Sequence, residues 1–120
     1  MELPIVYLDG GDFDINNSSL NIADALEKPV IVFVMSEGCM HCRNAKPAYQ
    51  EFATKYDGKV IAAVVDVNDH RGREFLTKIG YQITGVPDYL KFVHGRWVKE
   101  KPAARNLSAL VQFAFNKNVV

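Results

Sequence analysis

The stretch VIVFVMSEGCMHC, residues 30–42, decides the fold. Its first part, Val30 to Met35, is apolar at every position and mostly β-branched. Such a run predicts a strand that is buried on both faces, as in the centre of a parallel sheet. The SEG segment, residues 36–38, breaks the strand, and Cys39 and Cys42 follow at the start of a helical pattern. The stretch therefore predicts a central strand and a helix, with both cysteines at their junction.

The composition of the 120 residues limits the possible classes of protein. Fourteen basic and 14 acidic residues give a formal net charge of zero, which argues against nucleic-acid binding driven by bulk charge. The hydrophobic fraction of 48% excludes a disordered or collagen-like chain, and the length suits a single domain over residues 1–120. Two cysteines are too few for a multi-bridge secreted scaffold. No apolar run approaches the ~20 residues of a membrane helix, and the N-terminus lacks a secretory signal. We expect no leader in this chain: either it is cytoplasmic as given, or it is an extracytoplasmic domain whose leader has been removed.

The pattern on both sides of the central strand alternates between strands and helices. Alternation predicts an α/β fold with a mixed sheet, mostly parallel with a C-terminal antiparallel hairpin, and helices on both faces. Before the central strand we expect a strand at 5–8 and a helix over 20–26, which ends before Pro29. After it we expect a helix over 40–56, a strand at 60–67, a helix over 71–79, a hairpin of 89–93 with 96–99, and a helix over 107–114.

The two cysteines are placed for reversible thiol–disulfide exchange. Two intervening residues let the sulfurs face each other across the first helical turn, so a disulfide closes with little backbone motion. The start of a helix also offers unpaired N–H groups and the positive end of its dipole, and such settings lower a cysteine pKa to about 3.5–7.5. Because the thiolate is the nucleophile in exchange, we predict that Cys39 attacks and that the deeper Cys42 resolves.

His41 lies between the cysteines and is the third candidate catalytic residue. As a proton donor it favours the Cys39 thiolate, which stabilises the reduced form and makes the disulfide a stronger oxidant. Three plainer interpretations stay open: a neutral surface histidine, a static disulfide, and half of a zinc site. A zinc site needs two further ligands, and His70 and His94 are not spaced as a ligand pair. We expect neither a metal nor a cofactor.

Over nearly the whole chain, these motifs resemble the thioredoxin fold family, and more closely its protein disulfide isomerase-like branch. Pro47, five residues beyond Cys42, resembles the proline inside the family's active-site helix. The GVP segment, residues 85–87, lies where the family carries its cis-proline loop, and YLKF with the following HG resembles its next strand and turn. A histidine directly before the second cysteine is more similar to isomerases and bacterial disulfide-introducing oxidases than to reducing thioredoxins.

The resemblance implies roles for residues that are remote from the cysteines in sequence. Val86 and the cis-proline Pro87 would bind substrate, with the Val86 backbone pairing with an extended peptide beside Cys39. Arg105 resembles the isomerase arginine that approaches the active site, where it would modulate the pKa of Cys42. From its own chemistry, Met40 is an apolar and adaptable contact for substrate.

Several positions depart from the family's pattern. Gly38 replaces the usual tryptophan before the first cysteine, and Asp88 replaces the threonine after the cis-proline. Phe33 stands where the family often buries a carboxylate that relays a proton for the resolving thiol. Without that carboxylate, Cys42 must lose its proton to water or to another group, so we expect slow turnover.

The leading hypothesis is a thiol–disulfide oxidoreductase with oxidase or isomerase character. Its expected partners are protein thiols and disulfides and a redox protein that recycles the cysteine pair. One alternative is a thioredoxin-like reductant, and another is a binding module that has kept the fold but lost efficient catalysis. We expect a monomer that binds neither nucleic acid nor membranes.

Overall fold

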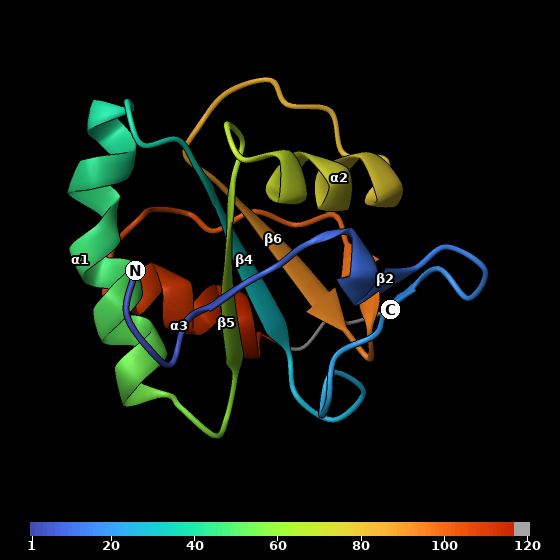
Figure 1. The fold of residues 1–120 in the computed structure, drawn as a ribbon. Helices are drawn as coiled ribbons and strands as arrows, with labels where there is room; N and C mark the ends of the chain where they lie inside the picture. The colour runs from blue at the N-terminus through green and yellow to red at the C-terminus, as the bar shows by residue number, and fades with distance from the viewer. Residues whose placement is uncertain (117–120) are drawn as a thin grey trace.

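A computed structural model describes residues 1–116 and contains a five-stranded mixed sheet in the order β1-β5-β4-β6-β7 (Figure 1). Strands β1, β5 and β4 run parallel, and β6 and β7 continue the sheet in antiparallel fashion. This arrangement confirms the predicted α/β fold with its antiparallel C-terminal hairpin. The strands are β1 (Val6–Tyr7), β4 (Val30–Met35), β5 (Ile61–Asp66), β6 (Asp88–Val93) and β7 (Arg96–Val98).

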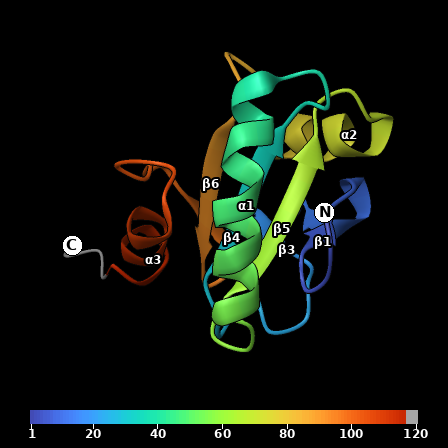
Figure 2. The ribbon, with the colours of Figure 1, turned by 90° about the vertical axis from the view of Figure 1, so that its left-hand side faces the viewer.

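Three α-helices cover the two faces of the sheet within residues 1–116: α1 (Met40–Lys55), α2 (His70–Ile79) and α3 (Leu107–Phe115). Figures 1 and 2 show α1 and α3 on one side and α2 on the other. Helix α1 continues through Pro47, and α2 ends at Gly80, whose positive φ of 80° is typical of a helix C-cap. None of the helices in this part of the chain is long and apolar enough to cross a membrane.

Strand β4 contributes side chains to the hydrophobic core on both faces of the sheet, because successive side chains of a strand point to opposite faces. Ile31, Phe33 and Met35 pack under α1 and α3, in a cluster that includes Cys42. Val30, Val32 and Val34 pack on the opposite face, with α2. All six residues of β4 are buried, as the sequence predicted for a central strand.

The helix predicted over 20–26 is wrong, because this segment forms part of a small hairpin and then turns. A 3-10 turn (η1, Gly10–Asp12) leads into β2 (Phe13–Asp14), which pairs with β3 (Ser19–Leu20). Asp24 has a φ of 69°, which a right-handed helix does not allow. Leu20 is buried but Leu26 is 67% exposed, so the helical spacing of these leucines does not mark one buried face.

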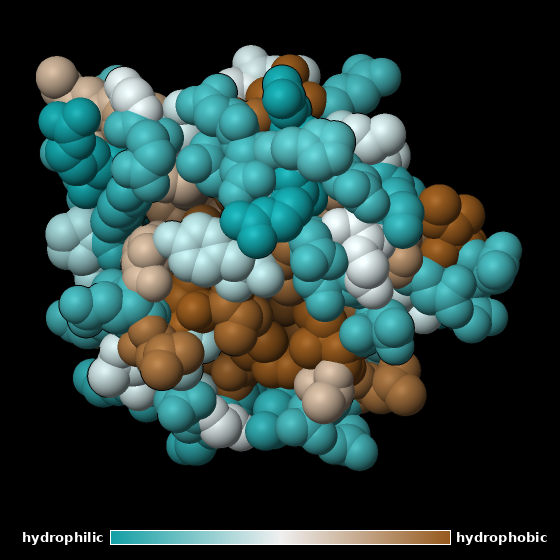
Figure 3. All heavy atoms as spheres, viewed as in Figure 1, coloured by the Kyte–Doolittle hydropathy of each residue, from teal (hydrophilic) through white to brown (hydrophobic). Residues whose placement is uncertain are grey.

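The free edge of β5 borders an apolar hollow in the surface. The short strand β1 pairs with β5 only at Ala63 and Val64. Beside the start of β5 lies a groove of about 240 Å³, whose apolar lining includes Val6, Ile22 and Ile61. Figure 3 shows apolar surface in a hollow on this side of the molecule.

Tyr49 ties α1 to the sheet beneath it. Its side chain is fully buried and stacks on Phe33 with ring centroids 5.0 Å apart. The hydroxyl donates toward the carbonyls of Ile31 at 2.9 Å and Ala63 at 2.7 Å, and accepts the Ala63 N–H at 3.2 Å. One side chain therefore holds α1 to both β4 and β5.

We predict that Tyr49→Phe lowers the free energy of unfolding by about 1–3 kcal/mol, because it leaves buried backbone groups without their partner. Urea denaturation measures this change. Tyr56→Phe, at the half-buried end of the same helix, is the matched control and should change stability by no more than about 0.5 kcal/mol. Equal unfolding midpoints for the two variants would contradict the role given to the Tyr49 hydroxyl.

Candidate active site

Strand β4 ends at Met35, and the chain then reaches Cys39 at the start of α1. Cys39 is the N-cap residue, with extended backbone, and its N–H donates to the Ser36 carbonyl at 3.2 Å. Its Sγ accepts a hydrogen bond from the Cys42 N–H at 3.0 Å. The sulfur thus takes the place of the side-chain oxygen that usually caps a helix. A negative charge on this sulfur is stabilised by the groups that a helix start leaves unpaired.

The two cysteines differ in exposure. Both are thiols in this structure, with Cys39 partly exposed and Cys42 fully buried. A substrate would reach the outer sulfur first, and the roles of Cys39 as attacking thiol and Cys42 as resolving thiol stay predictions. The intervening side chains of Met40, which is 68% exposed, and His41 both face solvent.

The surroundings of Cys39 favour its thiolate. Its pKa is lowered chiefly by a hydrogen bond from the Cys42 side chain, and also by the backbone N–H groups of Cys42 and His41 and the charge of Arg105. Partial burial acts in the opposite direction. The contribution of the backbone N–H groups is the one expected at a helix start, and His41 acts here through its backbone. The imidazole makes no hydrogen bond within residues 1–116, so its predicted catalytic role stays a prediction.

Cys42 is held in its protonated form. Burial is the main cause that raises its pKa to about 11, and the hydrogen bond with Cys39 adds to the rise. The Ser36 backbone and Arg105 lower the pKa by smaller amounts. As pH rises, Cys39 therefore loses its proton well before Cys42 does.

The cis-proline loop meets Cys39 from the other side. The Val86–Pro87 bond is cis, as the resemblance implied. Cys39 Sγ lies 3.6 Å from the Val86 carbonyl oxygen and, as a thiol, donates to it. Val86 and Pro87 are half-buried beside the sulfur, where a bound peptide would meet them. The structure thus brings together residues that are 47 positions apart; their binding of substrate stays a prediction.

Arg105 lies in the exposed loop before α3, and its positive charge reaches both cysteine sulfurs. Asp88 is turned to other partners. Its carboxylate accepts hydrogen bonds from the Tyr81 hydroxyl and from Lys101 Nζ, whose nearest approach is 2.9 Å. A cation at this distance balances the charge of Asp88, which weakens any repulsion between this carboxylate and a thiolate nearby.

Phe33 is fully buried at the position where the resemblance placed a carboxylate. Its ring contacts Tyr49 and Tyr89, with centroid distances of 5.0 Å and 5.3 Å. The sequence predicts Tyr89 only as a strand residue. No sequence motif marks it, because its position under α1 depends on how β6 pairs with β4.

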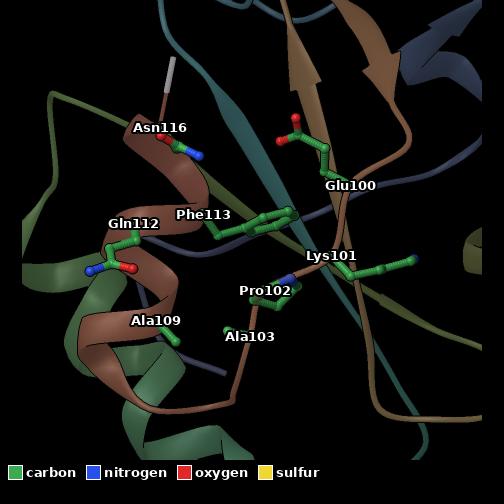
Figure 4. A pocket seen from close by; sticks show the side chains of 8 residues that line it. All are labelled: Glu100, Lys101, Pro102, Ala103, Ala109, Gln112, Phe113 and Asn116. Carbon is green, nitrogen blue, oxygen red and sulfur yellow. The ribbon is translucent and has the colours of Figure 1, made fainter. Parts of the chain in front are cut away.

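No predicted site residue lines the pocket of about 320 Å³ between α3 and the chain that precedes it (Figure 4). In Figure 4, Phe113 projects from α3 toward this chain, while the side chain of Lys101 points away from the helix. Across residues 1–116, no three His, Cys, Asp or Glu side chains gather as a possible metal site.

We predict that Cys42→Ala raises the pKa of Cys39, because it removes the side-chain donor that does most to lower it. Cys42→Ser is the matched variant: it keeps a hydroxyl donor of similar size and should raise the Cys39 pKa less. The rate of Cys39 alkylation as a function of pH measures both. If the two variants titrate alike, the Cys42 side chain does not stabilise the Cys39 thiolate.

Comparison with known proteins agrees with the geometry. The Thioredoxin family model matches residues 15–116. The chain is 31% identical to the putative thioredoxin-like protein 453L of Invertebrate iridescent virus 6, across 93% of each chain. It is also 31% identical to thioredoxin C-2 of Corynebacterium nephridii, across 81% of this chain and 85% of that one. The crystal structure of the Trx4 domain of ERdj5 superposes with a TM-score of 0.66 at 18% identity, covering 91% and 90% of the two chains. The family-model match over residues 15–116, together with a partly exposed Cys39 and a buried Cys42 at a helix start beside a cis-proline, shows that this chain belongs to the thioredoxin family of thiol–disulfide oxidoreductases.

Proposed function

We propose that this chain oxidises thiols to disulfides and isomerises disulfides in protein substrates. The observation that carries the proposal is the difference in pKa between its two thiols: the pKa of Cys39 is lowered, whereas that of Cys42 is raised to about 11. A stabilised Cys39 thiolate favours the reduced protein, so its disulfide is a stronger oxidant. The raised pKa of Cys42 slows its attack on a mixed disulfide, which gives the substrate's own thiols time to react.

Oxidation proceeds in two exchanges. A substrate thiolate attacks Cys39 Sγ in the Cys39–Cys42 disulfide, and Cys42 leaves as a thiolate that takes up a proton. A second substrate thiolate then attacks the substrate sulfur of the mixed disulfide and releases Cys39 as the stabilised thiolate. The substrate loses two electrons and the cysteine pair gains them, so a recycling redox protein must accept these electrons.

Isomerisation starts from the reduced pair. The Cys39 thiolate attacks a substrate disulfide and forms a mixed disulfide, and another substrate thiolate displaces Cys39, with no net change in electrons. Val86 supports this chemistry, because its backbone lies beside the sulfur where an extended peptide would pair with it. Met40 supports it as well, since 68% of its apolar side chain is open to a substrate. The substrates we propose are therefore extended segments of incompletely folded proteins.

Cysteine replacement tests the catalytic assignment. We predict that Cys39→Ser abolishes the reactivation of a scrambled, disulfide-bonded protein, because no nucleophile remains at the surface. Cys42→Ser should instead accumulate a covalent substrate adduct, seen on a non-reducing gel, because the adduct has lost its resolving thiol. Activity that survives Cys39→Ser would contradict the proposal, as would binding and cellular function that persist unchanged when both cysteines are replaced.

The reduction potential separates the proposed direction of electron flow from that of a reductant. The 31% identity to a thioredoxin makes a reductant the second candidate. We predict a potential for the Cys39–Cys42 pair between about −120 and −180 mV, whereas a value near −270 mV would indicate a reductant. Equilibration of the protein with glutathione buffers of defined ratio measures it.

A further inference from the structure

Tyr89 lies in the floor of the active site, beside the position that Phe33 occupies. The two residues are register partners in the antiparallel pair of β4 and β6, so their side chains lie on the same face of the sheet. That face is covered by α1, and both side chains belong to the core cluster that contains Cys42. Tyr89 is only 3% exposed, and its ring contacts those of Phe33 and Tyr49.

The Tyr89 hydroxyl is buried and has no hydrogen-bond partner among the residues that the structure describes. Neighbouring Tyr49 shows the usual arrangement, with its hydroxyl bonded to the backbone of two strands. A buried polar group without a partner is costly, and in a native protein it calls for an explanation. A partner that forms only during the reaction is one such explanation.

The position of the hydroxyl points to the resolving thiol as that partner, because Tyr89 and Cys42 are buried in the same core cluster under α1. The electrostatics agree: after burial, the charges of Arg105, which lowers the Tyr89 pKa, and of Cys42, which raises it, act on this hydroxyl. Burial is the largest cause and raises the Tyr89 pKa to about 12. The hydroxyl therefore keeps its proton at neutral pH and acts as a donor. Of the other titratable groups around this pair, Cys39 acts on Cys42, and the Tyr49 ring contacts that of Tyr89.

We propose that the Tyr89 hydroxyl donates a hydrogen bond to the Cys42 sulfur when that sulfur becomes a thiolate, and so assists the resolving step. This inference rests on the proposed function. The phenol is chemically distinct from a buried carboxylate: it stabilises the anion but does not accept its proton. The hydrogen bond from Tyr89 explains how the buried Cys42 ionises although Phe33, rather than a carboxylate, lies beneath α1.

The resolving step forms the Cys39–Cys42 disulfide and releases the substrate as a thiol. In the mixed disulfide between Cys39 and substrate, the Cys42 thiol gives its proton to water, and Tyr89 donates its hydrogen bond to the resulting thiolate. Cys42 attacks Cys39 Sγ, the bond from Cys39 to the substrate sulfur breaks, and the Cys39–Cys42 disulfide forms. The substrate sulfur leaves with the electron pair of the broken bond and takes a proton from water. Tyr89 retains its own proton throughout.

Tyr89→Phe tests this role, because it removes the hydroxyl and keeps the ring that packs on Phe33. The reduced protein is mixed with an aromatic disulfide reagent that releases a coloured thiolate. The first release reports attack by Cys39, and the second reports attack by Cys42 on the mixed disulfide. We expect Tyr89→Phe to slow the second phase about tenfold at neutral pH, as for a rise of one unit in the Cys42 pKa. The first phase should stay unchanged, and the pH profile of the second should move to higher pH.

Tyr56→Phe is the matched control and should leave both phases unchanged. A second measurement uses the Cys39→Ser background, where alkylation of Cys42 as a function of pH should show a higher pKa with Tyr89→Phe than without it. A second phase whose rate and pH profile match those of the wild type would overturn the inference. A wild-type first phase no faster than that of an ordinary thiol would instead overturn the proposed function, so the two failures are distinguishable.

Discussion

Burial of β4 on both faces is the constraint on which the rest of the structure depends. A strand with no exposed side chain needs a covering layer on each side, and α1 with α3 supplies one layer while α2 supplies the other. The strand must then leave the sheet at Met35, where the chain reaches the surface and turns into α1. That exit places Cys39 at the start of a helix, where its sulfur accepts the N–H of Cys42.

The asymmetry between the two thiols follows from this same exit. Cys39 precedes the helix and keeps part of its surface exposed, while Cys42 lies one turn further along, on the side that packs against the sheet. Exposure and hydrogen bonding favour ionisation of the first thiol, and burial opposes ionisation of the second. The strand-to-helix junction therefore supplies one thiol that ionises readily, Cys39, and one that stays protonated, Cys42.

An apolar floor under the active site has consequences for how protons move there. Phe33, Tyr49 and Tyr89 form a contiguous aromatic cluster beneath α1. This cluster stabilises the junction by packing, but it offers Cys42 no carboxylate as a proton acceptor. The Tyr89 hydroxyl within the core and the Arg105 guanidinium at the surface both stabilise an anion rather than take up a proton.

The sequence by itself determined the central strand, the helix that follows it and the cysteine pair, because burial leaves a continuous apolar run and a helix leaves a periodic one. It also predicted the hairpin after Pro87 from its two turn residues, His94 and Gly95. In the structure these residues have positive φ angles of 53° and 79°. The prediction from sequence was wrong for residues 20–26, where the backbone N–H of Leu20 bonds to the Gly95 carbonyl at 2.8 Å. This long-range contact outweighs the local helical spacing.

The active site shows the same division between local and tertiary information. The local CMHC motif identified Cys39, His41 and Cys42 as candidate site residues. The resemblance to a known family added Val86, Pro87 and Arg105. Only the tertiary structure decided that Val86 meets Cys39, that Lys101 balances Asp88 and that Tyr89 lies in the floor under α1. The physical reason is that strand pairing and helix packing set these contacts between residues distant in sequence, and neither leaves a local pattern.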